Sequence, residues 1–117
     1  MGIYSIVADI CDWQPLCNTY TFTVVFANSA PVFSSTASSS ITLHYGTATA
    51  LCIPTYSDPE GDPISITNYQ DGLSTLPSFV TFTSPVAYSF SPSSASDLGT
   101  YTIDSKICDG EPVCSVY

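Results

Sequence analysis

The feature that most constrains this chain is an internal repeat, because its last twenty residues resemble its first twenty. At a constant offset of 97 residues and without a gap, nine of the 20 aligned positions are identical, whereas composition alone gives about one. The residues that recur are Gly2, Tyr4, Ile6, Ile10, Cys11, Asp12, Pro15, Cys17 and Tyr20. A fixed period of this kind indicates an array of similarly built units.

The offset also predicts how the chain divides. We expect residues 1–27 to be the last two strands of one repeat, and residues 28–117 to be the next repeat without its final strand. That final strand should resemble residues 21–26 (TFTVVF). No signal peptide precedes the first strand pattern, which predicts a mature chain or a window from a longer one. The alternative is one domain with two similar edge hairpins.

Apolar and polar residues alternate along most of the chain, which is typical of strands with one face in a core. In residues 20–26 the apolar face is Tyr20, Phe22, Val24 and Phe26. Residues 101–107 follow the same pattern. Further strands are predicted at residues 41–45, 48–56, 63–69, 79–82 and 86–90, with most prolines and glycines between them. Short strands with frequent turns favour an all-β sandwich.

The charge balance excludes several classes of partner. Lys106 is the one basic residue against ten acidic residues, and the net charge is −9. Nucleic acids and anionic lipids are both recognised through basic residues, so we expect neither. No apolar run approaches the roughly 20 residues of a membrane helix, so we expect no membrane insertion in this segment. The serine- and threonine-rich residues 33–40 are candidates for O-linked glycans.

Five cysteines in 117 residues indicate an oxidising compartment, and hence an extracellular or cell-surface protein. Cys11 and Cys17, like Cys108 and Cys114, enclose five residues at a predicted hairpin turn, where facing strands bring Cβ atoms close enough for a disulfide. We predict the pairs Cys11–Cys17 and Cys108–Cys114. The rival is a disulfide between sheets, Cys52–Cys108. In the first scheme Cys52 is either a free buried thiol or a link between chains.

Several short motifs follow one another in the order of one extracellular repeat. They are residues 28–33 (NSAPVF), 58–63 (DPEGDP), 76–82 (LPSFVTF), 97–101 (DLGTY) and the closing-strand pattern 19–24 (TYTFTV). Together they resemble the dystroglycan-type cadherin-like repeats and the related immunoglobulin-like repeats. Phe79 departs from the tryptophan that is usual in the family. The resemblance implies an immunoglobulin- or cadherin-like Greek-key β-sandwich in tandem repeats, used in adhesion, stalks or matrix without catalysis.

Asp58, Glu60 and Asp62 alternate around a proline and a glycine, so a turn could bring their carboxylates onto one calcium ion, which takes six to eight oxygen ligands. Asp109 is a candidate fourth ligand. The resemblance points the same way, since cadherins bind calcium between domains at an acidic motif in this place. The other interpretation is a solvated acidic turn shaped by Pro59 and Gly61. Beyond calcium, the sequence indicates no cofactor.

Two residues invite a functional interpretation outside the acidic turn. Trp13 lies in the turn between Cys11 and Cys17, where an exposed aromatic ring could stack on a sugar or anchor a neighbouring domain. A partly buried hydrophobic cap is the alternative. His44 is the single histidine, and no catalytic signature surrounds it. We therefore expect a protein that is not an enzyme.

The sequence thus predicts a structural, extracellular tandem-repeat protein that forms a stalk, fibre or adhesive filament. Its expected partners are adjacent copies of the same repeat. The alternative function is that of a calcium-dependent adhesion module or a carbohydrate-binding module. A bound ion at the acidic turn would favour the first of these, and a concave aromatic cluster near Trp13 the second.

Overall fold

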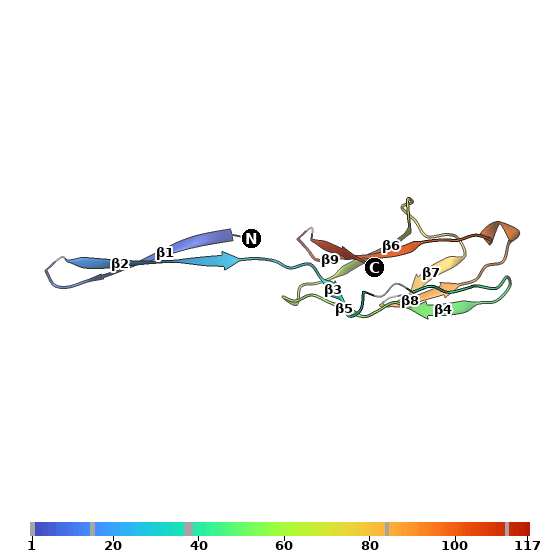
Figure 1. Cartoon of the computed structure of the whole chain (residues 1–117), viewed down its shortest axis with the longest axis horizontal. Coiled ribbons are helices and arrows are strands. Elements are labelled where there is room, and N and C mark those ends of the chain that lie inside the picture. Colours follow the sequence, from blue (N-terminus) through green and yellow to red (C-terminus); the bar gives the residue numbers. More distant parts are fainter. Residues whose placement is uncertain (1, 15, 37–38, 84, 112) are drawn as a thin grey trace.

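A computed structural model describes residues 2–14, 16–36, 39–83, 85–111 and 113–117. The expectations for Met1, Pro15, Pro112 and part of the serine-rich run (residues 37–38) lie outside the described residues. The molecule is elongated, with principal extents of 89 × 22 × 20 Å. It consists of a slender two-stranded hairpin in line with a layered β body (Figure 1). No helix in the described part is long and apolar enough to cross a membrane.

The hairpin consists of β1 (Gly2–Cys11) and β2 (Cys17–Phe26), which pair antiparallel from Gly2 opposite Phe26 to Cys11 opposite Cys17. Alternating β-branched and aromatic residues favour these long strands. The turn is closed by the backbone N–H of Asp12, which donates to the carbonyl oxygen of Leu16 at 3.1 Å. Among the described strands, β1 and β2 pair only with each other.

The described residues of the body form two three-stranded antiparallel sheets and one short two-stranded pairing. One sheet has the order β10–β9–β6 and the other β4–β8–β7, while β3 pairs with β5. The bounds are β3 Val32–Phe33, β4 Thr49–Cys52, β5 Tyr56–Ser57, β6 Ser65–Gln70, β7 Val80–Thr83, β8 Ala87–Phe90, β9 Ile103–Cys108 and β10 Cys114–Val116. A 3₁₀ turn at Ala95–Asp97 is capped by Ser94. The prediction of an all-β fold is confirmed.

The core lies between the two three-stranded sheets. Ile53, Val80, Tyr88 and Phe90 form its buried centre. Side chains from the opposite sheet, including Ile66 of β6 and Ile103 of β9, pack against this centre. Burying each such side chain stabilises the fold by about 1.5–3 kcal/mol.

A polar cluster also joins the two sheets. Tyr88 on β8 is only 3% exposed, and its hydroxyl group donates to Oδ1 of Asn68 on β6 at 2.6 Å. It also lies 2.6 Å from the hydroxyl oxygen of the buried Ser105 on β9, and Ser105 itself donates to Asn68 Oδ1 at 2.9 Å. Because these polar groups are buried, their mutual bonding avoids the cost of leaving them unpaired.

The hairpin of β9 and β10 repeats the geometry of β1 and β2. Cys108 lies opposite Cys114, and the backbone N–H of Asp109 donates to the carbonyl oxygen of Val113 at 3.4 Å, as Asp12 does to Leu16. Disulfides close both hairpins, with S–S distances of 2.04 Å for Cys11–Cys17 and 2.06 Å for Cys108–Cys114. The strands differ in length, since β2 has ten residues and β10 has three.

Two strand predictions need correction. Residues 41–45 alternate as a strand should but pair with no described strand. The expected strand at residues 48–56 is split into β4 and β5, because the chain leaves β8 after Ile53 and turns toward β3. Pro54 lies at this change of partner, where its missing N–H costs no ladder bond.

We predict that Tyr88→Phe lowers the free energy of unfolding by about 1 kcal/mol at neutral pH, because one hydroxyl leaves a buried network whose other two members still bond each other. Burial raises the pKa of Tyr88, its hydrogen-bonding contact with Ser105 lowers it, and the negative charge of Asp104 raises it. The stability linked to this pKa is therefore present below about pH 10 and is lost as the pH rises through the folded-state pKa. Denaturant titrations from pH 8 upward test this.

Tyr88→Phe should show a smaller loss of stability above pH 10 than the parent chain. Tyr45→Phe is the matched control, since it removes the hydroxyl group of an exposed tyrosine outside the buried network. If the free energy of unfolding fell equally steeply with pH in the parent chain and in Tyr88→Phe, Tyr88 would not be the source of this pH dependence.

We predict unequal effects for the two disulfides. Replacing Cys108 and Cys114 with serine should lower the stability of the body by about 2 kcal/mol, since the disulfide restricts the unfolded chain near a core strand. Replacing Cys11 and Cys17 should leave the unfolding midpoint of the body unchanged and should speed amide exchange in β1 and β2 alone, because these two strands pair with no other described strand. An equal loss of body stability in both variants would be evidence against this account.

Candidate functional site

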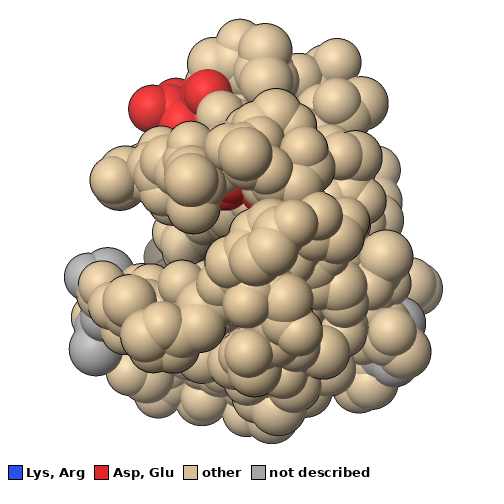
Figure 2. Space-filling model, turned by 90° about the vertical axis from the view of Figure 1, so that its right-hand side faces the viewer, with Lys and Arg blue, Asp and Glu red and all other residues tan. Residues whose placement is uncertain are grey.

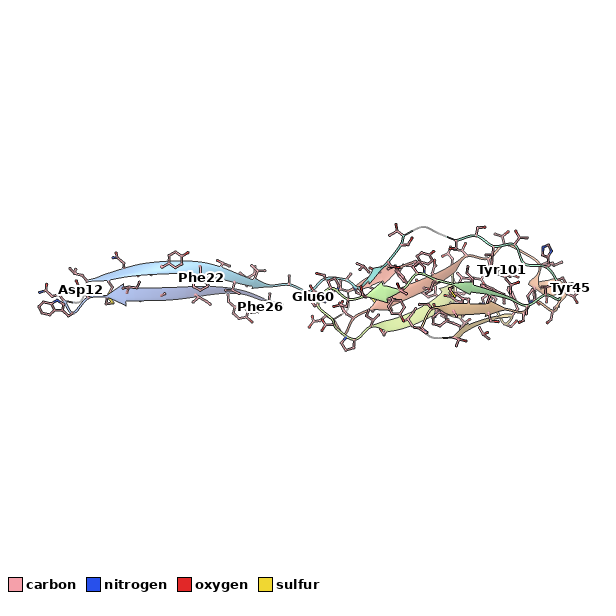
Figure 3. All side chains as sticks on the ribbon, turned by 90° about the horizontal axis from the view of Figure 1, so that it is seen from below. Asp12, Phe22, Phe26, Tyr45, Glu60 and Tyr101 are labelled. Atoms are coloured by element: carbon pink, nitrogen blue, oxygen red, sulfur yellow. A yellow bond between two sulfur atoms is a disulfide. The ribbon has the colours of Figure 1, made fainter. Side chains whose placement is uncertain are left out.

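The junction between the hairpin and the body is held by hydrogen bonds from the segment that follows β2. The side-chain amide of Asn28 donates to Oδ2 of Asp109 at 2.7 Å, and the hydroxyl group of Ser29 donates to Oε1 of Glu60 at 2.8 Å. Pro31 is fully buried a few residues later. Glu60 marks this junction in Figure 3, with Asp12 at the free tip of the hairpin. The linker is therefore bonded to two separate loops of the body.

The acidic turn at residues 58–62 is ordered by its first carboxylate. Oδ1 of Asp58 accepts the backbone N–H groups of Glu60 at 2.9 Å and Asp62 at 3.0 Å. Gly61 has a φ of +84°, in the left-handed region that favours glycine, and its N–H donates to the carbonyl oxygen of Asp58. These bonds explain why an Asp and a Gly occupy their positions without any ligand.

The four predicted calcium ligands are not gathered into one cage. In the described part of the chain, no group of three or more His, Cys, Asp and Glu side chains is arranged to hold a metal. Two of the four nevertheless have a buried carboxylate oxygen without a hydrogen-bond partner among the described residues, namely Oδ2 of Asp58 and Oδ1 of Asp109. Such oxygens are costly to bury, so each could still accept a bond from water or a cation. Calcium binding stays a prediction.

The remaining cysteine has a different setting from the one expected. Cys52 is a free thiol, but it is exposed on β4 and not buried. The rival disulfide Cys52–Cys108 is absent, since Cys108 is bonded to Cys114. A link between chains through Cys52 stays a prediction.

Trp13 projects at the free tip of the hairpin and is 90% exposed. It makes no ring contact with another aromatic residue among those described, so the structure does not build a concave aromatic cluster around it. In this structure almost the whole indole is open to solvent, so no described residue makes it a buried cap. Stacking on a sugar or against a neighbouring domain stays a prediction.

A concave feature of the body extends toward the end far from the hairpin. It is a groove of about 500 Å³ between residues 39–45 and residues 97–105, called here the open groove. Its apolar floor is Ile53, Val80, Tyr88 and Phe90 from the core. Figure 2 looks onto this end, where a hollow opens on one side in a surface with few acidic atoms. Asp97 lines the groove and the exposed His44 does not, so the groove does not join histidine and carboxylate.

The sequence predicts that the body lacks its final strand, but it does not identify residues 39–45 as the second wall of the groove. The alternation of Ile41, Leu43 and Tyr45 was the available signal, and it was interpreted as an ordinary strand. These three side chains line the groove. The alternation therefore reports an apolar wall, and not a strand that is already paired.

Comparison with known proteins gives no further identification, since no family model, no curated protein and no solved structure matches the chain.

We predict that Asn28→Ala lowers the free energy of unfolding of the body by about 1–3 kcal/mol, because it removes the hydrogen bond to Asp109 and leaves a buried carboxylate with no side-chain donor among the described residues. Asn18→Ala, at an exposed position of β2, is the matched control and should be neutral. Chemical denaturation of both variants measures the difference, and a neutral Asn28→Ala would contradict this role.

Proposed function

We propose that this chain belongs to a structural, extracellular protein in which immunoglobulin- or cadherin-like sandwich repeats stack in line to form a stalk, fibre or adhesive filament. The observation that carries the proposal is the likeness of the β1–β2 hairpin to the β9–β10 hairpin. Sequence, register, turn hydrogen bond and disulfide all recur at the 97-residue offset. One hairpin belongs to the body, and the other lies in line with it.

Burial at equivalent positions supports the idea that residues 1–27 belong to a preceding repeat. Ile107 in β9 is completely buried, whereas its equivalent Ile10 in β1 is 76% exposed. The same face of the hairpin also carries Tyr4 and Phe22, both exposed. A face with the residue pattern of a core strand is stabilised when a second sheet covers it and removes its apolar side chains from water. In the proposed array, the rest of the preceding repeat provides that sheet.

The position of the junction supports stacking in line. Asp109, in the turn of the β9–β10 hairpin, binds Asn28 at the hairpin end of the body. Tyr101 and Tyr45 lie at the opposite end (Figure 3). The disulfide-closed turn of the body therefore faces the end of the preceding hairpin. In the array, Asp12 would occupy the corresponding place one repeat earlier.

The chemistry of the surface suits a mechanical role. A single basic residue leaves almost no site for trypsin-like proteases, and disulfides persist in oxidising surroundings. The absence of a long apolar helix in the described residues and the presence of two disulfides are compatible with secretion. The partners in this proposal are adjacent copies of the repeat, and no catalytic role is assigned.

We predict that the native polypeptide has a mass many times the 12.4 kDa of these 117 residues and that negative-stain images show straight rods with a constant axial repeat. The mass is measured before and after reduction and deglycosylation, so that disulfide-linked subunits and glycans are separated from polypeptide length. A reduced, deglycosylated mass near 12.4 kDa would sink the covalent array.

Calcium-dependent adhesion is the second candidate function, favoured by the two unpartnered carboxylate oxygens at the junction. It predicts a higher melting temperature in millimolar calcium, abolished in Asp109→Asn and retained in Asp12→Asn, whose side chain is exposed at the hairpin tip. An unchanged melting temperature would remove this candidate. Carbohydrate recognition is favoured only by the exposure of Trp13.

A further inference from the structure

We propose that the open groove is the acceptor site for one additional β-strand, and that its occupant is an extended polypeptide with the apolar pattern of residues 21–26, running antiparallel to residues 99–103. This inference rests on the proposed function, because it uses the equivalence of the two hairpins to specify the strand. It adds the register, the side chains that enter the groove and the wall that they meet.

The hydrogen-bond ladder of the body leads directly into the groove. Tyr117 and Ser105 exchange both backbone hydrogen bonds, at 2.9 and 3.0 Å. In an antiparallel ladder such pairs recur at every second residue, so the N–H and C=O groups of Ile103 and Tyr101 point to the same edge as those of Ser105. β10 ends at Val116, before it reaches them. This edge can therefore accept a strand that continues the ladder.

The first hairpin shows which side chains suit this edge. There Ile6 lies opposite Phe22, Tyr4 opposite Val24 and Gly2 opposite Phe26. At the 97-residue offset the partners are Ile103, Tyr101 and Gly99. The occupant would therefore place phenylalanine, valine and phenylalanine at alternate positions facing the core. All three of the body residues line the groove.

The glycine at the end of this series fits an aromatic occupant. In the first hairpin the ring of Tyr4 lies over Gly2, so close that an added Cβ would come within 2.8 Å of it, and Phe26 meets that ring edge-on at a centroid distance of 5.6 Å. In the body the ring of Tyr101 lies over Gly99 in the same way, with 3.4 Å to an added Cβ. The platform for the second phenylalanine is therefore already formed.

The opposite wall of the groove carries three large apolar side chains among smaller polar ones and lies close to the end of β10. Ile41, Leu43 and Tyr45 line it at alternate positions. The hydroxyl oxygens of Ser39 and Tyr117 are 3.1 Å apart, so this segment begins beside the last residue of the ladder. A strand entering after Tyr117 would lie between this wall and β9. It would cover the groove and give residues 41–45 a backbone partner.

Strand β2 of a second copy is a poor occupant for a geometric reason. By the shared register, the backbone groups of Phe22 and Val24 already face β1. The free edge of β2 carries the groups of the residues between them, and pairing through that edge would turn the side chains of Thr21, Thr23 and Val25 into the core. The site therefore selects a strand that is free on the edge shared by its phenylalanines.

The test uses the 117-residue chain and two synthetic peptides. The first has the sequence of residues 21–28, and the control has the same composition with residues 22 and 23 exchanged, which puts the two phenylalanines on opposite faces of the strand in any register. We expect the first peptide to bind with 1:1 stoichiometry by calorimetry, at least tenfold more tightly than the control. It should slow amide exchange at Tyr101 and Ile103 while leaving β7 unchanged.

A second measurement covers the case of weak binding in solution. The same two sequences are joined to the chain directly after Tyr117, and the unfolding midpoints are compared. We expect a higher midpoint, with protection of Tyr101 and Ile103, for the natural order alone. Equal effects of both sequences, or no effect of either in both measurements, would overturn the proposal.

Protection of Tyr101 and Ile103 that rises with the concentration of the chain alone would also overturn it, because a second copy would then be the occupant. The outcome is separable from that of the array. A native mass near 12.4 kDa with selective peptide binding would remove the covalent array and keep the acceptor site. A large native mass without selective peptide binding would keep the covalent array and remove the acceptor site.

Discussion

The register of the β9–β10 hairpin is the constraint on which the rest of the structure depends. Cys108 lies opposite Cys114, so the disulfide fixes the pairing at one end of the ladder. A slip of one residue would turn every side chain of β10 to the other face. The same register places Asp109 at the linker and Tyr117 at the mouth of the open groove. Junction and groove are therefore two consequences of one pairing.

The sequence could predict this hairpin because its determinants are local. Alternation, a short turn and two cysteines lie within a few residues of one another, and the repeat states the pattern twice. The all-β class follows from the same alternation. The bonds of Asn28 to Asp109 and of Tyr88 to Asn68 and Ser105 could not be predicted, because they join residues 81, 20 and 17 positions apart. Such pairs are brought together only by the packing of the sheets.

The acidic turn shows where a motif underdetermines chemistry. Three alternating carboxylates suit calcium and also suit a self-capped turn. In the structure Asp58 binds the backbone of its own turn and Glu60 binds the linker through Ser29, which gives two of the three a structural role without an ion. The remaining support for calcium binding is one buried oxygen each of Asp58 and Asp109 that has no hydrogen-bond partner among the described residues. Their burial depends on the fold, so the motif alone could not single them out.

The open groove and the exposed hairpin face follow from the same physical requirement. A β-strand has two edges to pair and one face to bury, and this structure leaves one edge and one apolar face uncovered. In β1 and β2 the apolar face is left uncovered, since Ile10 is exposed where its equivalent Ile107 is buried. In the body the strand edge at Tyr101 and Ile103, beside the wall formed by residues 41–45, is left without a described partner strand. Because the two hairpins are equivalent, the strand pattern that fits the body's edge can be read from β2. In the proposed array, the same repeated pattern would account for both the covered hairpin face and the strand that fills the groove.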